Sequence, residues 1–461
     1  MIKDEDRNPE TMNTQDTIAA IATPPGSGGI GIIRISGPDA EKVLSRVFRS
    51  AGTSGNMQES HKMYYGKLAD GDETVDECMA VLMRAPKSYT REDVAEIQLH
   101  GGTYVLSTAL ELCLKNGARM AEPGEFTRRA FLNGRVDLSR AEAVMAMISA
   151  RGEQEHRAAV RQINGGAAAF VRQFADELYG LQAGLAACID YPEEISDEEG
   201  AGMILPGLES LKRRLRDSID EHASRLIHQG LMVALAGRPN VGKSSLMNAL
   251  LGEDRAIVTS IPGTTRDTVH GEMSINGFRV ILTDTAGLRD TDDPVEKIGV
   301  ERSEKALREA DAALIVLDAS EPLHEEDRIL LERFDGTGAV VLNKSDLPAV
   351  LSEHEIRELR PDLTVITLSA KEPETLKPLR KFLNRFLVMS DRVALTQPRH
   401  LDAAKRAVAH LEDAMATLDC FTPDLAATDL QAAQAALSEI TGDRADEKLL
   451  DRVFSDFCVG K

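Results

Sequence analysis

The chain has 461 residues, and at usual domain sizes this length predicts about three domains. Hydrophobic residues make up 42% and charged residues 28%, which is typical of a globular protein with sizeable cores. No stretch approaches the roughly 18 apolar residues of a membrane span. The net charge of −21 argues against indiscriminate nucleic-acid binding but leaves room for a local basic patch.

The N-terminal segment and the cysteines indicate the compartment. Residues 1–15 are polar and acidic, unlike a signal peptide, and we expect a disordered leader there. The cysteines lie far apart without a C-x-x-C pair, which predicts free thiols in a reducing cytoplasm. They are Cys78, Cys113, Cys188, Cys420 and Cys458.

Residues 16–135 have the pattern of a mixed α/β domain. Two strand-like runs, at 18–23 and 30–35, are separated by a glycine-rich segment at 24–29. Because this segment precedes a strand rather than a helix, it favours a hairpin turn over a phosphate-binding loop.

The rest of this N-terminal region predicts a strand, a helix and a turn. Alternating apolar residues at 94–100 indicate the strand, and residues 104–114 indicate the helix. The polar segment 122–129 is typical of a turn, and its composition assigns it no chemistry.

The pattern is helical across residues 138–228. Ser139 and Glu142 fit the capping box of a first long helix. The acidic break at 191–199 favours a solvated loop over a metal site. Residues 208–227 predict another helix, whose interleaved charges favour a solvated face with ion pairs over a nucleic-acid surface.

Strands and helices then alternate from residue 231 to about residue 388, which predicts a parallel sheet with crossover helices. The strands are expected at 231–236, 278–283, 312–317, 338–342 and 364–368. Helices follow at 400–418, 424–441 and 449–457. Because the helices on both flanks share one character, the simplest architecture inserts the α/β block into one helical domain. A separate C-terminal bundle is the alternative.

The predicted fold class is therefore a multidomain α/β plus α protein. Its expected parts are a leader (1–15), an N-terminal α/β domain (16–135), a helical domain made of two segments (136–229 and 389–461), and an inserted domain (230–388) with a mostly parallel sheet. Residues 237–244 of the inserted domain fit a P-loop, 284–287 read Asp-Thr-Ala-Gly and 343–346 read Asn-Lys-Ser-Asp, which together predict a Ras-like P-loop GTPase domain.

The strongest motif is at residues 237–244, which fit the P-loop pattern G-x-x-x-x-G-K-[ST] between a strand and a helix. Gly237 and Gly242 let backbone N–H groups turn toward phosphate oxygens at the helix N-terminus. Lys243 is predicted to reach the β- and γ-phosphates, and the Ser244 hydroxyl is predicted to bind Mg²⁺.

Two motifs for the γ-phosphate follow the P-loop. Residues 263–267 read Gly-Thr-Thr-Arg-Asp, and one threonine is expected to complete the Mg²⁺ shell. Residues 284–287 read Asp-Thr-Ala-Gly, which supplies a carboxylate at Asp284 near Mg²⁺ and an N–H at Gly287 for the γ-phosphate.

Two further motifs indicate the base. Residues 343–346 read Asn-Lys-Ser-Asp, and the Asp346 carboxylate can accept from guanine N1–H and the 2-amino group, which adenine cannot supply. Residues 369–371 fit the loop over the base. The predicted GTP site comprises Asn240, Val241, Gly242, Lys243, Ser244, Ser245, Thr259, Ser260, Ile261, Pro262, Gly263, Thr264, Thr265, Asp284, Thr285, Ala286, Gly287, Asn343, Lys344, Asp346, Ser369, Ala370 and Lys371.

Hydrolysis needs another group, because Leu288 stands where Ras-like proteins place the glutamine that orients water. An additional positive charge is also needed to stabilise the transition state. The candidates near in sequence, among which residue chemistry does not choose, are Arg266, Arg289, Asp290, Asp292, Asp293, Glu296 and Lys297.

From about residue 16 to residue 461 the chain resembles the MnmE (TrmE) family of tRNA-modification GTPases. The resemblance rests on GTPase motifs inserted among helices and on several short segments. These are Thr-Pro-Pro-Gly at 23–26, Gly-Ile-Gly-Ile-Ile-Arg-Ile-Ser-Gly at 29–37, Pro-Gly-Glu-Phe-Thr at 123–127, Ala-Phe-Leu-Asn at 130–133, and Phe-Cys-Val-Gly-Lys at 457–461, where the family usually has Cys-Ile-Gly-Lys.

The resemblance implies GTP hydrolysis with K⁺ in place of an arginine finger. The implied K⁺ ligands are Asn240, Thr259, Ile261 and Thr264, and the Mg²⁺ ligands are Ser244 and Thr265. Glu296 matches the family's catalytic glutamate, although by itself it would be interpreted as an exposed residue at a helix start. Two GTPase domains are implied to meet across the nucleotide when GTP and K⁺ bind.

The resemblance also implies that the N-terminal domain binds 5-formyltetrahydrofolate and forms a homodimer. Arg34, Glu96, Arg135 and Lys461 match its folate-binding positions, and Cys458 matches a position near the one-carbon unit. Arg135 stands where the family often has lysine, which keeps the charge but alters the hydrogen-bond geometry.

The implied function is addition of a carboxymethylaminomethyl group, or a relative, at C5 of the wobble uridine of certain tRNAs. The implied partner in a heterotetramer is MnmG (GidA), an FAD protein; the absence of a Rossmann fingerprint in this sequence agrees with delegated flavin chemistry. The alternatives are a regulatory GTPase or a ribosome-assembly GTPase that binds rRNA. The latter predicts an appended RNA-binding module, for which the sequence has no motif.

Overall fold

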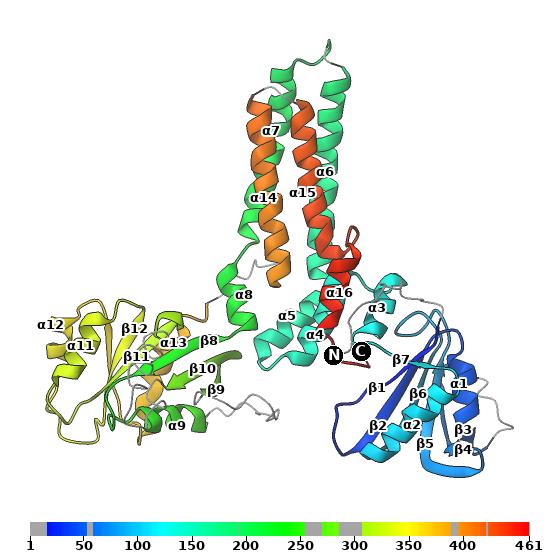
Figure 1. The fold of residues 1–461 in the computed structure, drawn as a ribbon. Coiled ribbons are helices and arrows are strands. Elements are labelled where there is room, and N and C mark those ends of the chain that lie inside the picture. Colours follow the sequence, from blue (N-terminus) through cyan, green and yellow to red (C-terminus); the bar gives the residue numbers. More distant parts are fainter. Residues whose placement is uncertain are drawn as a thin grey trace, which may run out of the picture. The chain divides into compact units, whose positions relative to one another are not determined.

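The computed structural model describes residues 16–52, 59–191, 193–253, 270–284, 307–388, 395–420 and 423–460. The chain forms two compact units (Figure 1). The first unit comprises Met1–Met145, Ile163–Val171 and Ser438–Lys461, and the second comprises Ala146–Gln162 and Arg172–Leu437.

The first unit contains a seven-stranded sheet in the order β3-β4-β5-β6-β2-β1-β7. Its strands are β1 (Ile18–Ile21), β2 (Gly28–Ser36), β3 (Phe48–Ser50), β4 (Met63–Asp70), β5 (Glu73–Met83), β6 (Val94–Gly101) and β7 (Arg119–Met120). β1 and β2 pair antiparallel, which confirms the predicted hairpin, and β6 confirms the alternating strand.

Alternation along β2 separates the core from the opposite face of the sheet. Ile33 and Ile35 are fully buried against α1 (Ala40–Val47) and α2 (Thr103–Lys115). Arg34, between them, therefore points to the other face, because successive side chains of a strand alternate.

The polar segment predicted as a turn is mostly a helix, so that prediction is wrong beyond residue 124. α3 spans Glu125–Leu132, and the Glu125 side chain is only 1% exposed. Arg119 and Arg129 contact Glu125 at 2.7 and 2.9 Å and also contact Asp16 at 2.7 and 2.6 Å. These ion pairs neutralise the buried Glu125, to which the composition of the segment assigned no chemistry.

The predicted capping box at Ser139 is also wrong by two residues. α4 spans Leu138–Ser149, so Ser139 lies inside the helix. The Asp137 carboxylate accepts from the Arg140 N–H at 2.9 Å and from the Ser139 hydroxyl at 2.6 Å. Asp137 therefore caps the helix.

The first turn of α4 packs against α16 (Glu447–Ser455), the last helix of the chain. α16 contributes Leu450 and Phe454 to a cluster with Leu138 and Phe457. The chain end is thereby attached to the first unit.

The helices of the second unit come from both flanks of the α/β block. They are α5 (Glu153–Ile163), α6 (Gly166–Asp190), α7 (Asp197–Asp217), α8 (Glu221–His228), α14 (Pro398–Asp419) and α15 (Pro423–Thr441). The last residues of α5 and α15 and the first residues of α6 belong to the first unit. α14 packs along α7 and also contacts α8 (Figure 1). The helices before and after the block thus share one bundle, as the simplest architecture predicts.

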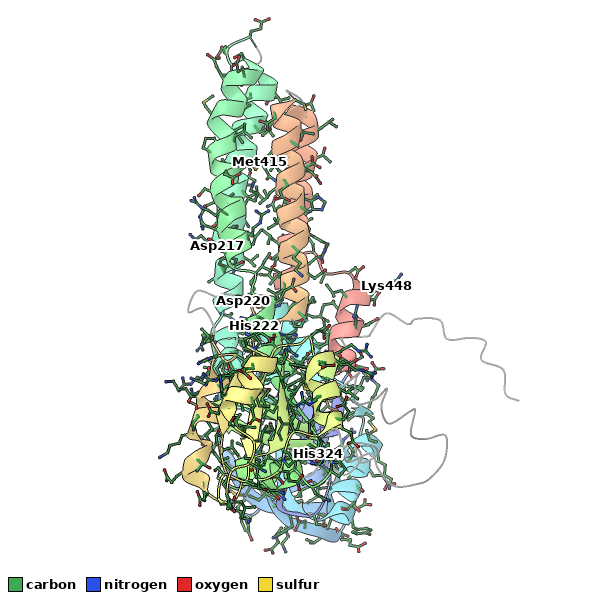
Figure 2. The ribbon with its side chains drawn as sticks, turned by 90° about the vertical axis from the view of Figure 1, so that its left-hand side faces the viewer. Asp217, Asp220, His222, His324, Met415 and Lys448 are labelled. Carbon is green, nitrogen blue, oxygen red and sulfur yellow. The ribbon has the colours of Figure 1, made fainter. Side chains whose placement is uncertain are left out.

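The single helix expected at 208–227 is two helices. α7 ends at Asp217, and α8 starts after Asp220, whose carboxylate accepts from the Ala223 N–H at 2.9 Å. Figure 2 shows Asp217, Asp220 and His222 in order along this break. The acidic loop is also shorter than expected, because Ser196 caps α7.

The second unit also contains a six-stranded sheet in the order β13-β12-β11-β8-β10-β9. Its strands are β8 (Leu231–Ala236), β9 (His270–Ile275), β10 (Phe278–Asp284), β11 (Ala312–Asp318), β12 (Gly338–Asn343) and β13 (Thr364–Thr367). All pairs are parallel except β9 with β10. The five predicted strands are confirmed; β9 was not predicted.

Helices cover both faces of this sheet, as the fully buried β11 requires. They are α9 (Lys243–Glu253), α11 (Glu325–Arg333), α12 (Glu353–Leu359), the 3₁₀ turn Pro373–Leu376 and α13 (Lys377–Asn384). Leu314 and Leu379 belong to the core on one face, and Ile315 and Leu331 to the core on the other. In the ranges that the structure describes, no helix has the length and apolarity needed to cross a membrane.

Candidate nucleotide and N-terminal sites

The P-loop connects β8 to α9, and its two glycines cannot be replaced without displacement of backbone or side chains. Gly237 has φ 149°, and a Cβ there would lie 2.2 Å from the Val316 carbonyl oxygen. Gly242 has φ 97°, and a Cβ there would lie 2.2 Å from Nδ2 of Asn343. The loop is therefore pressed against the neighbouring strands.

Lys243 is only 4% exposed and folds back over this loop. Its Nζ donates to the carbonyl oxygens of Gly237 at 2.7 Å and Arg238 at 2.8 Å. Both acceptors are neutral, so an anionic phosphate oxygen is a stronger partner for the ammonium group.

Ser244 and Asp284 bring together the two oxygen types that the sequence predicted near Mg²⁺. The Ser244 hydroxyl donates to Oδ2 of Asp284 at 3.3 Å, and Asp284 is 5% exposed. A hydroxyl and a carboxylate at this spacing fit a hard divalent cation that keeps several water ligands.

The predicted base-recognition residues gather at the ends of β12 and β13. Nδ2 of Asn343 donates to the Val241 carbonyl at 2.8 Å, and its Oδ1 accepts from the Ala370 N–H at 3.0 Å. The buried Asn343 amide therefore ties the P-loop to the 369–371 loop.

Asp346 is fixed as an anionic acceptor. The Ser369 hydroxyl donates to Oδ1 at 2.7 Å, and the Lys371 ammonium group donates to Oδ2 at 3.1 Å. These two hydrogen bonds lower the pKa of the Asp346 carboxyl below its usual value. The carboxylate form suits acceptance from two guanine donors.

Asp318, the last residue of β11, is a member of this site that no sequence motif predicted. Its side chain is 3% exposed and pairs with Lys344, whose backbone has φ 66°. Burial raises the pKa of Asp318, but hydrogen bonds from Lys344 and Ser320 hold it below the usual value. Its position at the carboxyl end of a parallel strand beside β12 was the available signal.

Part of the predicted site lies outside the described residues. This part comprises Thr259, Ser260, Ile261, Pro262, Gly263, Thr264, Thr265, Thr285, Ala286, Gly287, Glu296 and Lys461, together with Leu288 and the other candidate catalytic residues between 266 and 297. Of the implied K⁺ ligands, Asn240 is described: it is exposed and has φ 63°. Ser245 is exposed in the first turn of α9.

The predicted folate residues Arg34 and Glu96 pair across neighbouring strands. They are opposite each other in the antiparallel register of β2 and β6, and Nε of Arg34 donates to Oε1 of Glu96 at 2.9 Å. Their side chains are 16% and 17% exposed. An arginine nitrogen also donates to the Gly460 carbonyl at 3.3 Å, which brings the chain end to this pair.

Tyr89, which no sequence motif predicted, joins Arg135 to this group. The guanidinium carbons of Arg34 and Arg135 lie 5.5 and 4.8 Å from the centre of the Tyr89 ring. Arg135 also donates to the Tyr89 carbonyl at 3.1 Å. Only the tertiary fold places this aromatic ring between two cations.

The C-terminal tail is seated next to the 122–124 turn. Pro123 and Val459 form an antiparallel bridge, and the Gly124 N–H donates to the Cys458 carbonyl at 3.4 Å. Gly460 has φ 95°, and a Cβ there would lie 2.4 Å from the Ile21 carbonyl oxygen. Cys458 is exposed, and all five cysteines are free thiols.

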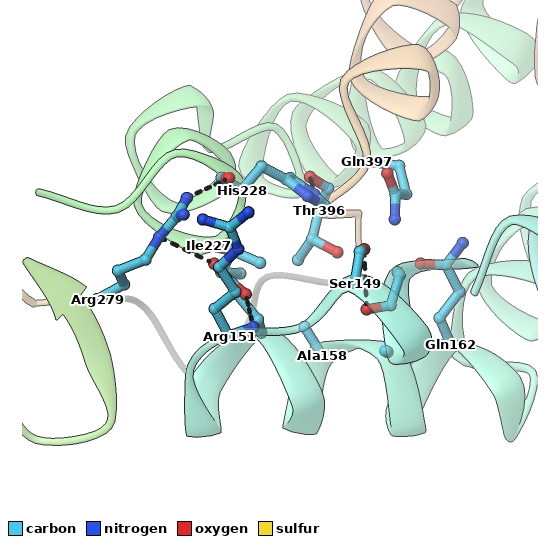
Figure 3. A pocket seen from close by; sticks show the side chains of 12 residues that line it. Ser149, Arg151, Ala158, Gln162, Ile227, His228, Arg279, Thr396 and Gln397 are labelled. Atoms are coloured by element: carbon cyan, nitrogen blue, oxygen red, sulfur yellow. Dashed lines mark hydrogen bonds and ion pairs between the residues drawn. The ribbon is translucent and has the colours of Figure 1, made fainter. Parts of the chain in front are cut away.

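A separate cavity of about 280 Å³ lies in the second unit, between α5, the end of α8 and the 396–397 segment (Figure 3). Arg279 and Glu155 line it, 3.5 Å apart, and Arg279 also donates to the His228 carbonyl at 3.0 Å. Burial lowers the pKa of His228. None of the predicted GTP or folate residues lines this cavity.

A P-loop between a strand and a helix, followed by an Asn-Lys-x-Asp loop on a mostly parallel sheet, defines a Ras-like GTPase fold. Residues 17–135 match the family model described as "GTP-binding protein TrmE N-terminus", and residues 138–458 match that of the "MnmE helical domain".

Curated relatives match nearly the whole chain. The tRNA modification GTPase MnmE of Heliobacterium modesticaldum is 45% identical over 97% of this chain and 99% of its own. That of Lactiplantibacillus plantarum is 44% identical over 98% of this chain and 100% of its own. The chain belongs to the MnmE family of tRNA modification GTPases.

Among solved structures, an Aquifex aeolicus Era variant bound to GDP·AlF4⁻ is similar. It is 31% identical, with a TM-score of 0.29, over 40% of this chain and 66% of that chain.

Proposed function

We propose that this chain is a K⁺-activated GTPase that acts with an FAD-dependent partner on the wobble uridine of certain tRNAs. The proposed product carries a carboxymethylaminomethyl group at C5, with a tetrahydrofolate derivative as the one-carbon source. The observation that carries most weight is a complete P-loop cradle in a chain that matches tRNA modification GTPases over 97% of its length.

The described residues support GTP binding in defined roles. Lys243 would transfer its hydrogen bonds from loop carbonyls to the β- and γ-phosphates, and Asp346 would select guanine. Ser244, with Thr265, would hold Mg²⁺, and Asp284 would lie beside it. The bound ion would neutralise charge on the phosphate oxygens.

For hydrolysis, the proposed K⁺ ligands are Asn240 with Thr259, Ile261 and Thr264, and Glu296 would orient the attacking water indirectly. The Asn240 side chain lies in the middle of the P-loop and is exposed, which suits this role. K⁺ would supply the positive charge that an arginine finger supplies in other GTPases.

The proposed K⁺ role is tested by GTP turnover of the full chain in KCl and in NaCl at equal ionic strength. We expect turnover about 100-fold faster in KCl, the lower end of what one preorganised transition-state donor contributes. Equal rates in both salts would reject it. Asn240→Ala should abolish the difference while leaving GDP binding measurable.

The N-terminal group supports the folate proposal. Arg34, Glu96, Arg135 and the chain end with Lys461 would bind 5-formyltetrahydrofolate, and Cys458 would lie near the one-carbon unit. The Arg34–Glu96 pair offers hydrogen-bond donors and an acceptor next to each other, which suits the mixed donors and acceptors of a pterin ring.

The proposed assembly is a homodimer that forms a heterotetramer with MnmG, in the cytoplasm, with tRNA as substrate. Deletion of the gene should remove the wobble modification from tRNA nucleosides measured by mass spectrometry, and the intact gene should restore it. Unchanged modification after deletion would contradict the tRNA role.

A further inference from the structure

The first side chain of the P-loop is tied to a helix that contains none of the nucleotide motifs. Nε of Arg238 donates to Oδ2 of Asp327 on α11 at 2.8 Å. A second nitrogen of Arg238 donates to Glu321 at 3.2 Å. The Arg238 side chain is 17% exposed, Asp327 3% and Glu321 50%, so the contact with Asp327 is the desolvated one.

Asp327 depends on Arg238 for its charge balance. Within the described ranges, Arg238 is the cation that the structure pairs with Asp327. Oδ2 also accepts from the His324 N–H at 3.3 Å, whereas the buried Oδ1 has no hydrogen-bond partner in the described part of the chain. A buried carboxylate with one cationic partner holds that partner firmly, because separation would leave both charges desolvated.

The same arginine is linked to the phosphate-binding lysine through its backbone. The Arg238 carbonyl accepts from Nζ of Lys243 at 2.8 Å. Arg238 therefore lies between Asp327 on one side and Lys243 on the other. Its backbone position affects where the loop carbonyls and the lysine ammonium group lie.

The loop benefits from such a support because one of its non-glycine residues has a left-handed backbone. Asn240 has φ 63°, which a residue with a side chain adopts at a cost in free energy. A conformation of this kind persists only when the surroundings impose it. The base that imposes it is rigid, since Leu331 of α11 is 1% exposed and packs in a core with Leu317.

We propose that Asp327 is a positioning residue for nucleotide binding: through Arg238, it holds the P-loop in the conformation that receives the β-phosphate. This inference rests on GTP binding at the P-loop, and it does not depend on K⁺, folate or tRNA. It assigns to α11 a part in the site that the sequence motifs do not contain.

The test compares GDP with GMP, which lacks the β-phosphate, in calorimetric titrations of the full chain with Mg²⁺. For Asp327→Asn, we expect the Kd for GDP to rise about 3- to 10-fold and that for GMP to change less than about 2-fold. The KM for GTP should rise in parallel with little change in kcat, because the lost support acts on bound substrate and transition state alike.

Asp311→Asn is the matched control. Asp311 is a 6% exposed carboxylate that pairs with Arg225 at 2.6 Å and accepts from the Met232 N–H, at the opposite end of β8 from the P-loop. It should leave the ratio of GDP to GMP affinity unchanged. Equal loss of GDP and GMP affinity in Asp327→Asn, or a lower melting temperature alone, would overturn the inference.

If Asp327→Asn folds poorly, variants of Arg238 provide a second test. Arg238→Lys keeps the charge but loses the planar fork, so GDP affinity should fall by an intermediate amount. Arg238→Gln combined with Asp327→Asn should be no weaker in GDP binding than Arg238→Gln alone. Additive losses would show that Asp327 does not act through Arg238. Failure of the unmodified chain to bind GDP would instead reject the nucleotide site itself.

Discussion

Lys243 in the P-loop and Arg34 in the N-terminal sheet are both largely buried cations. Their hydrogen-bond acceptors differ in charge. Lys243 donates to two neutral carbonyls, whereas Arg34 is paired with the Glu96 carboxylate. A phosphate oxygen at Lys243 would therefore compete with neutral carbonyl acceptors. The N-terminal pair is already neutral, and a ligand there has to match both a donor and an acceptor.

This difference predicts what each site selects. A phosphate that replaces a carbonyl at Lys243 turns a hydrogen bond to a neutral acceptor into one between opposite charges. A ligand that only carried negative charge would gain less at Arg34, because Glu96 would repel it. The comparison is therefore between selection by charge and selection by hydrogen-bond pattern.

The largest expected effect is at Lys243. Lys243→Ala should weaken GTP binding about 100-fold or more, because a buried charged partner of the phosphates is removed. Fluorescent-nucleotide titration measures this. Folate binding by the same variant should be unchanged; a parallel loss of both ligands would indicate misfolding rather than a local effect.

The second effect sharpens the N-terminal side of the comparison. Arg34→Gln should weaken 5-formyltetrahydrofolate binding about 10- to 100-fold, since it removes donors and leaves Glu96 unpaired. Calorimetry provides the measurement. Lys67→Gln, which removes an exposed cation from β4, is the control and should have no effect. If Arg34→Gln bound folate as tightly as the parent, the assignment of this pair would be wrong.

A pH dependence of stability should follow from the ion pairs that Asp16 and Glu125 form with two arginines in the N-terminal region. Burial raises the pKa of Asp16 and Glu125, but hydrogen bonds from Arg119 and Arg129 outweigh burial and hold both below their usual values of 3.8 and 4.5. Carboxyls with lowered folded-state pKa stabilise the fold above about pH 4.5, and this contribution is lost as the pH falls through the folded values.

Scanning calorimetry of the full chain from pH 7 to pH 3 measures that loss. Glu125→Gln should lower the melting temperature at pH 7 and reduce its dependence on pH below about 4.5, because one of the two coupled carboxyls is gone. An identical pH profile for the variant and the parent would contradict the role of these ion pairs.

The smallest effect is expected at Arg135. Arg135→Lys keeps a positive charge near the Tyr89 ring but loses the planar guanidinium group and its hydrogen bond to the Tyr89 carbonyl. Folate affinity should fall by no more than about 5-fold, in line with an exposed cation–π contact. Tyr89→Leu should have a larger effect, since it removes the surface shared by both arginines.

The sequence by itself determined the elements whose signals are local. The P-loop, the Asn-Lys-x-Asp loop and five strands of the GTPase sheet are found where spacing and apolar runs predict them, because each signal lies within one short segment. Boundaries that depend on a side-chain cap were less well predicted: Asp137, rather than Ser139, caps α4.

Only the tertiary structure decided which residues distant in the sequence hydrogen-bond to each charged side chain. Arg34 and Gly460 are 426 residues apart and Arg238 and Asp327 are 89 apart, yet each pair forms a hydrogen bond. Glu125 was predicted to lie in a polar turn, and its burial against Arg119 and Arg129 depends on the helix and the fold around it. Whether a charged side chain is exposed or buried depends on the partner that the fold supplies, and for Arg34 and Arg238 that partner is distant in the sequence.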